Sequence, residues 1–146
     1  MVEVSGSRVT HVDNGVLELG KAELSGRLAT LFAGLERVIE EYGPVEVAVE
    51  GVFTGRNARS ALTLGHARGV ALLAAARRQL PLFEYPPATV KKAVSGSGRA
   101  DKAQVQRAVQ MLLELPESAQ ADAADALAIA YCHAIRRPAI VLRGRR

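Results

Sequence analysis

Helical and extended patterns alternate along this chain, and that alternation limits its fold more than any other feature. Between residues 21 and 41, apolar side chains recur at steps of three and four, which predicts an amphipathic helix. Gly43-Pro44 ends this pattern, and VEVAVE at 45–50 then alternates strictly, which predicts a strand ending at Glu50. Helices and strands that alternate pack as layers, so the sequence predicts an α/β domain with helices covering a sheet.

The other expected elements follow from turn and capping signals. Residues 8–18 have the pattern of two short extended runs, and the Asn14-Gly15 pair predicts a tight turn between them. Asp101 and Gln104 have the spacing of a capping box, which predicts a helix with Val105, Val109, Leu112 and Leu113 on its buried face. We also expect helices at about 57–79 and 119–135, a strand in LPLFEY at 80–85, a turn of helix in TVKKAV at 89–94, and a flexible connector in SGSGR at 95–99.

Composition restricts the class of protein. With 49% hydrophobic and 23% charged residues in a chain of 146, we expect one globular domain over residues 1–135 and a basic tail over 136–146. The sequence has no signal-like start and no apolar run near the ~20 residues that span a bilayer, which favours the cytoplasm. The single Cys132 excludes an internal disulfide, and its apolar surroundings predict a buried thiol that is not a nucleophile.

A stripe of small residues and the three histidines are interpreted through packing and not through chemistry. Ala61, Gly65 and Gly69 lie four residues apart on the second predicted helix, so another backbone, from the sheet or from a second subunit, can approach that stripe. The three histidines show no ligand-like spacing and are expected to be structural or surface residues: His11, His66 and His133.

Charge is segregated along the chain. Residues 56–107 hold ten basic and two acidic side chains, whereas residues 108–135 hold four acids and no Lys or Arg. A basic surface attracts polyanions, and an acidic cluster beside it requires cations to tolerate a phosphate. A solvated surface with ordinary charge blocks accounts for the same pattern.

Three carboxylates are candidate metal ligands. Glu50 ends a predicted strand, and sites in α/β sheets collect at the carboxyl ends of strands. Asp122 and Asp125 lie at i and i+3, so both project from one side of the last helix. Mg²⁺ binds through a few carboxylates and keeps water and phosphate oxygens at its other positions. The alternative is simple stabilisation of the helix start by its acids.

Several long blocks, in order, resemble the RuvC family of Holliday junction resolvases. They are VAVEGVF, ALTLGHARGVALLAA, EYPPATVKKAVSGSGRADKAQVQ and QADAADALAIAYCHA, and the resemblance runs from about residue 2 to His133. It implies a ribonuclease H-like mixed sheet covered by helices, a homodimer, and magnesium-dependent nicking of a four-way DNA junction during recombination and repair. It also implies two Mg²⁺ per subunit in an intact enzyme, and action beside a branch-migration motor complex.

The resemblance assigns roles residue by residue. Glu50, Asp122 and Asp125 match metal ligands, while Lys91 and Lys102 match basic residues near the scissile phosphate. Phe53 matches an aromatic residue that stacks on bases where the junction opens. The basic residues expected along the DNA are Arg56, Lys91, Lys92, Arg99 and Lys102, with Arg59, Arg68 and Arg107 as further members of the group.

One segment of the family pattern is absent from the sequence. The family begins with a strand ending in Gly-Ile-Asp-Pro-Gly, whose Asp is a central metal ligand, and MVEVSGSRVTHVDNGVLELG matches the strand and hairpin after it. We expect the natural reading frame to start upstream of Met1.

Two alternatives to a nuclease stay open. A catalytically impaired or non-cutting module that recognises branched DNA agrees with the missing acid. A small α/β protein whose basic segment binds nucleic acid nonspecifically agrees with the charge pattern alone.

Overall fold

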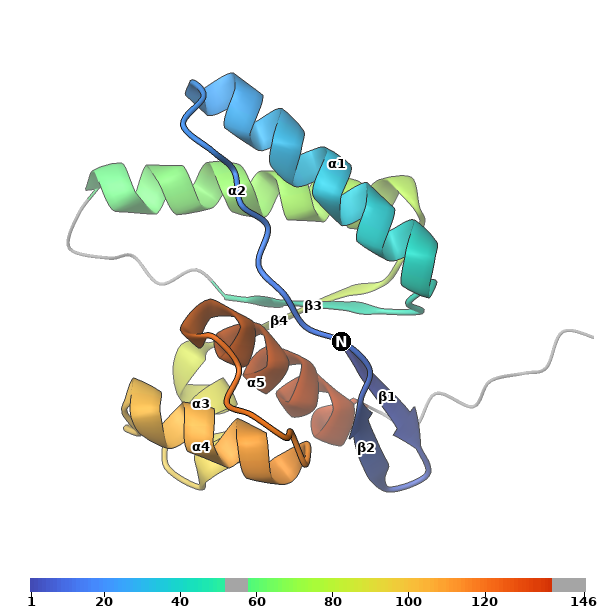
Figure 1. Cartoon of the computed structure of the whole chain (residues 1–146), viewed down its shortest axis with the longest axis vertical. Coiled ribbons are helices and arrows are strands. Elements are labelled where there is room, and N and C mark those ends of the chain that lie inside the picture. Colours follow the sequence, from blue (N-terminus) through green and yellow to red (C-terminus); the bar gives the residue numbers. More distant parts are fainter. Residues whose placement is uncertain (52–57, 138–146) are drawn as a thin grey trace, which may run out of the picture. The chain divides into compact units, whose positions relative to one another are not determined.

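The computed structural model describes residues 1–51 and 58–137, and it divides the chain into two compact units (Figure 1). The terminal unit contains Met1–Asn14 and the chain from Pro87 onward, and the middle unit is Gly15–Pro86. The predicted α/β class is confirmed, with described strands that form two two-stranded sheets, one in each unit. The single domain over residues 1–135 stays a prediction.

The middle unit contains two helices and a parallel strand pair. The helices are α1 (Leu24–Tyr42) and α2 (Ala58–Arg77), which pack against each other. The strands are β3 (Val47–Glu50) and β4 (Leu82–Tyr85), in a register that pairs Glu50 with Tyr85. The predicted strand therefore ends at Glu50, as its alternation indicates.

The ends of α1 show how glycines limit this helix. Gly43 adopts a left-handed conformation with φ of 54°, and its N–H donates to the Ile39 carbonyl at 2.9 Å, which confirms the predicted stop. The start at residue 21 was wrong, because α1 begins at Leu24. A turn with Gly20 in the left-handed region, at φ of 64°, occupies the preceding residues and delays the helix.

Charged side chains join the two helices of the middle unit. The guanidinium of Arg78 lies 3.4 Å from a Glu36 carboxylate oxygen and 3.8 Å from one of Glu40. The guanidinium of Arg77 lies 5.7 Å from the centre of the Phe32 ring, within the range of a cation–π interaction. These contacts fix the end of α2 against α1, directly before the chain enters β4.

The terminal unit begins with a hairpin that differs from the prediction. Strands β1 (Val2–Ser5) and β2 (Arg8–His11) are antiparallel and are joined at Gly6 and Ser7, so the predicted turn at Asn14-Gly15 was wrong. Gly6 supplies the left-handed φ of 61° that a two-residue connection needs. The Asn14 side chain instead contacts His11, with 2.7 Å between Oδ1 and Nε2.

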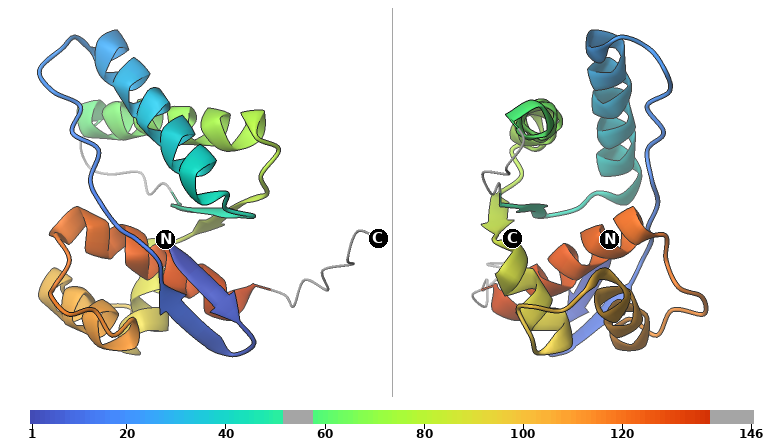
Figure 2. Two further views of the ribbon diagram at one scale, coloured as in Figure 1. Left: turned by 45° about the vertical axis from the view of Figure 1, so that its right-hand side comes forward. Right: turned by 90° about the vertical axis from the view of Figure 1, so that its left-hand side faces the viewer.

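Helix α5 (Ala121–Arg136) is the central element of the terminal unit. It contacts both hairpin strands and the helices α3 (Pro87–Ser95) and α4 (Lys102–Leu112), as the views in Figure 2 show. Most of its buried residues are small or apolar, and one is polar: Ala123, Ala124, Leu127, Ala128, Cys132 and His133. Small side chains let neighbouring helices approach closely, so this face forms the core of the unit.

Two details of α3 and α4 refine the sequence reading. The predicted turn of helix at 89–94 is a nine-residue helix that starts at Pro87, since proline is favoured at the first helical position. The capping box is confirmed: Asp101 accepts from the Gln104 N–H at 2.8 Å, and Gln104 accepts from the Asp101 N–H at 2.9 Å. Leu113 is buried as expected, but Leu112 is exposed.

The predicted burial of Cys132 is confirmed, since its side chain is fully buried. Burial raises the pKa of the thiol, an effect partly offset by Arg136.

Over the described ranges, every helix falls short of the length and apolarity that a bilayer crossing requires.

We expect Cys132 to resist alkylation in the folded protein. Burial keeps the reagent out, and the raised pKa lowers the thiolate fraction at pH 8, so iodoacetamide should react at least about tenfold more slowly than in unfolded protein. Mass spectrometry of timed samples with and without urea measures both rates. Equal rates in the two conditions would contradict the packing of α5.

Candidate nuclease site

Glu50 is held at the end of the parallel strand pair. It is the last residue of β3, its side chain is exposed, and it lies opposite Tyr85 of β4. The ladder continues one step further, because the Gly51 N–H donates to the Tyr85 carbonyl at 2.9 Å. Hydrogen bonds on both sides of Glu50 therefore fix its backbone, and its carboxylate is presented to solvent at a strand end.

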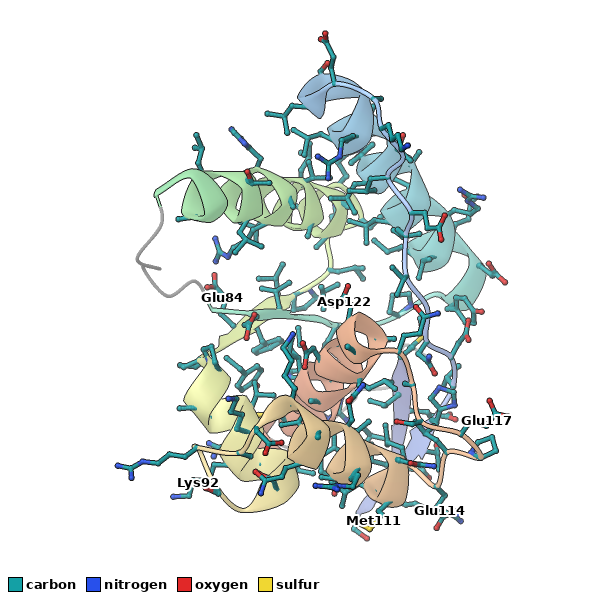
Figure 3. The ribbon with its side chains drawn as sticks, turned by 60° about the vertical axis from the view of Figure 1, so that its left-hand side comes forward. Glu84, Lys92, Met111, Glu114, Glu117 and Asp122 are labelled. Carbon is teal, nitrogen blue, oxygen red and sulfur yellow. The ribbon has the colours of Figure 1, made fainter. Side chains whose placement is uncertain are left out.

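An ion pair connects α2 to β4 in the same unit. Arg68 on α2 contacts the carboxylate of Glu84, which Figure 3 labels on β4. The Arg68 side chain is 26% exposed, and its Nε is buried without a hydrogen-bond partner. Arg68 was a member of the basic group expected along DNA, but its guanidinium is engaged with Glu84. In this structure Arg68 connects α2 to β4 within the middle unit.

Asp122 and Asp125 project from the first turns of α5. Figure 3 shows Asp122 near the start of the helix, where its negative charge interacts favourably with the helix dipole. Asp122 is exposed and Asp125 is half-buried, while Ala123 and Ala124 between them are buried. The two carboxylates therefore belong to the side of α5 that its alanine packing leaves free.

The terminal unit brings a lysine next to this acidic pair. Lys102 is the first residue of α4, and its Nζ lies 3.9 Å from an Asp125 carboxylate oxygen. The Lys102 side chain is 75% exposed, so the ammonium keeps donors free for a further anion. On α3, Lys91 is half-buried and Lys92 is exposed, and Figure 3 shows Lys92 projecting outward.

The carboxylates are divided between the two units. Glu50 belongs to the middle unit, whereas Asp122 and Asp125 belong to the terminal unit. No group of three or more His, Cys, Asp or Glu side chains that could hold a metal ion occurs among residues 1–51 and 58–137. The aspartate pair, open to solvent on one side of a helix, suits a hydrated Mg²⁺ that takes one or two carboxylates.

Other predicted residues have different outcomes. Phe53 and Arg56 lie outside the described residues, as does the side chain of Arg59. Arg99 and Arg107 are exposed on the terminal unit, consistent with their proposed contact to a polyanion. The roles of all these residues stay predictions.

The small-residue stripe on α2 has space above it. A Cβ atom added at Gly65 or at Gly69 would meet nothing within 4 Å in the described part of the chain. The sheet is therefore not the partner that approaches this stripe here, and the second-subunit alternative stays a prediction.

Sequence reasoning missed the role of Ser95. SGSGR was interpreted as a flexible connector because of its glycines, yet the Ser95 hydroxyl lies 2.7 Å from the Lys91 carbonyl oxygen and bonds to the connector as well. The signal that could have indicated this anchor is a serine at the end of a helix, because serine hydroxyls there often donate to the carbonyl four residues earlier, here that of Lys91.

Within the terminal unit, two aspartates at a helix start and the lysine beside Asp125 are groups that can bind a divalent cation and a phosphate oxygen. The family model described as crossover junction endodeoxyribonuclease RuvC matches residues 1–133. The chain therefore belongs to the RuvC family.

Similar proteins carry the same description. The RuvC of Syntrophotalea carbinolica is 55% identical over 135 residues, which cover 92% of this chain and 84% of that protein. The RuvC of Stutzerimonas stutzeri is 48% identical over 144 residues, covering 99% of this chain and 83% of the relative.

Solved structures agree with the sequence comparison. Thermus thermophilus RuvC in complex with a Holliday junction substrate matches with a TM-score of 0.84 at 33% identity, over 92% of this chain and 83% of that one. A second T. thermophilus RuvC structure matches with a TM-score of 0.78 and the same identity and coverage. The predicted ribonuclease H-like fold is thereby confirmed.

We expect Arg68→Ala to destabilise the middle unit. The change removes both the packing of a largely buried side chain and the partner of Glu84, so it should lower the free energy of unfolding by about 1–2 kcal/mol. The exposed Arg99 is the control, and Arg99→Ala should change it by less than about 0.5 kcal/mol. Urea denaturation measures both. Equal stability of the two variants would show that the ion pair has no structural role.

Proposed function

We propose that this protein resolves Holliday junctions by magnesium-dependent hydrolysis of phosphodiester bonds in DNA. The observation that carries the proposal is the placement of Lys102 beside Asp125 in a chain that matches the RuvC family over residues 1–133. A related protein, T. thermophilus RuvC, has been solved in complex with a Holliday junction substrate. Family membership and the local geometry therefore support the same substrate and the same chemistry.

Three carboxylates are the proposed metal ligands: Glu50 of the middle unit, and Asp122 and Asp125 of the terminal unit. Their oxygens suit Mg²⁺, and mutual repulsion disfavours bringing them together without a cation. When bound, such ions favour deprotonation of a water and offset charge on the leaving oxygen. Of these proposed ligands, Asp125 is also the one whose carboxylate lies 3.9 Å from the Lys102 ammonium.

The lysines act on the phosphate itself. The Lys102 ammonium has three donors and contacts Asp125 at 3.9 Å, so it can bind a phosphate oxygen without leaving the carboxylate. Its positive charge would then offset the negative charge that develops as the phosphodiester bond breaks. We assign Lys91 a similar supporting role, because it lies on α3 in the same unit.

Binding of DNA rests on a larger basic group. Lys92, Arg99 and Arg107 are exposed on the terminal unit and would contact phosphates in a way that weakens as salt increases. Phe53 is proposed, from the family resemblance alone, to stack on bases where the junction opens, and Arg56 is proposed to contact DNA phosphates as a member of the basic group.

The symmetry of the substrate determines the proposed assembly. A four-way junction requires two nicks at matching positions, so we propose a homodimer in which each subunit cuts one strand. We further propose two Mg²⁺ per subunit, association with a branch-migration motor, and a cytoplasmic location, all from the family resemblance.

We expect Glu50→Gln to abolish junction cutting. The change replaces a ligand oxygen charge with a neutral amide, which should lower the cutting rate at least about 100-fold in Mg²⁺. A labelled four-way junction on a denaturing gel measures this loss, and a native gel in Ca²⁺ measures binding, which should persist.

The matched control is Glu117→Gln. Glu117 is exposed in the terminal unit before α5, and Figure 3 labels it, so the same chemical change there should leave cutting unaltered. Cutting by Glu50→Gln at the wild-type rate would contradict the proposed site. Junction binding by the wild-type chain without any cutting would instead support a branched-DNA-binding module.

A further inference from the structure

The connector between α3 and α4, residues 95–101, is anchored by the Ser95 hydroxyl. The Ser95 Oγ lies 2.7 Å from the Lys91 carbonyl oxygen and 3.1 Å from that of Ser97, and it can donate to one of them at a time. The same oxygen accepts from the Ser97 N–H at 3.4 Å. One side chain therefore ties the end of α3 to the first residues of the connector.

The rest of the connector is equally constrained. The Arg99 N–H donates to the Ser97 Oγ at 3.3 Å, and the Ala100 N–H donates to the Ser97 carbonyl at 3.3 Å. At Gly98, an added Cβ would lie 3.2 Å from the Ala88 carbonyl oxygen. The connector thus runs back against the first turn of α3, in contact close enough to favour glycine.

This path determines where α4 starts. Ala100 is 3% exposed, Asp101 caps the helix, and Lys102 is its first residue. The ion pair of Lys102 with Asp125 spans 3.9 Å between side chains that are 75% and 47% exposed, and such pairs are too weak to hold a lysine in place alone. The position of the ammonium therefore depends on the backbone that leads to it.

We propose that Ser95 is a positioning residue for Lys102 in the cutting reaction, which rests on the function proposed above. Its hydroxyl contacts the carbonyl of Lys91 and the segment that leads to Lys102. It therefore also helps to fix the backbone positions of the two lysines relative to each other. Loss of the hydroxyl frees the connector, and the Lys102 ammonium then samples positions away from the phosphate.

The test is a double-mutant cycle on the full chain with Ser95→Ala and Lys102→Ala. Displacement of a reacting group by about 1 Å costs up to about 100-fold in rate, so Ser95→Ala should lower the single-turnover cutting rate by about 10- to 100-fold. In the Lys102→Ala background, Ser95→Ala should cause no further loss, because the lysine that it positions is gone.

Three controls separate positioning from folding. Ser95→Thr keeps a hydroxyl and should restore most of the rate, while Ser7→Ala, in the exposed hairpin turn, should behave as wild type. Junction affinity in Ca²⁺ and the thermal midpoint should match wild type in Ser95→Ala. If that variant does not fold, Ser97→Ala takes its place, since it removes the acceptor of the Arg99 N–H and should show a smaller loss with the same non-additivity.

Two outcomes would overturn the proposal. Cutting by Ser95→Ala at the wild-type rate would show that the hydroxyl is unimportant. If the fold-loss in rate of the double variant equals the product of the two single fold-losses, Ser95 acts independently of Lys102. Failure of the wild-type protein itself to cut a junction contradicts the proposed function instead, so the two failures are distinguishable.

Discussion

Close packing on the alanine side of α5 is the constraint on which the terminal unit depends. Ala123, Ala124 and Ala128 admit the neighbouring elements at short range, and Leu127 and Cys132 fill the remaining core. This packing commits one side of the helix to the interior. The acids at 122 and 125 consequently lie on the free side, and α4 approaches closely enough for its first lysine to meet the second of them. The proposed ligands and the core residues of the terminal unit thus belong to one helix.

The middle unit positions its carboxylate by a different route. Glu50 follows three half-buried residues of β3, and the ladder to β4 extends past it to Gly51. Arg68 and Glu84 connect α2 to the neighbouring strand, so an ion pair between secondary elements supports the strand pair that presents Glu50. Each unit therefore fixes its own acids through its own packing.

The sequence predicted well those elements that depend on residues close together in the chain. Alternation placed the strand end at Glu50, and the spacing of Asp101 and Gln104 identified a capping box that the structure contains. The aspartates at i and i+3 were correctly expected on one side of a helix. The nuclease family followed from long ordered blocks, because no single motif in the chain is specific enough.

The errors arose where several turn signals compete or where tertiary contacts decide. The sequence predicted the turn at Asn14-Gly15, whereas the structure closes the hairpin at Gly6-Ser7, and the Asn14 side chain contacts His11. The connector at 95–99 seemed flexible from its glycines, but Ser95 and the contact of Gly98 with Ala88 constrain it. The engagement of Arg68 by Glu84 depends on a helix and a strand distant in sequence, which no local pattern reports.

The central claim is that Glu50 and the pair Asp122 and Asp125 bind the same divalent cations, and cleavage of the protein by bound Fe²⁺ tests it most directly. Fe²⁺ that replaces Mg²⁺ generates hydroxyl radicals with ascorbate and peroxide, and these cut the backbone close to the ion. The account predicts cuts near residue 50 and near residues 122–125, both suppressed together by excess Mg²⁺ and both lost in Asp125→Asn. Cuts at only one of the two places, or cuts near residue 50 that survive in Asp125→Asn, would contradict it.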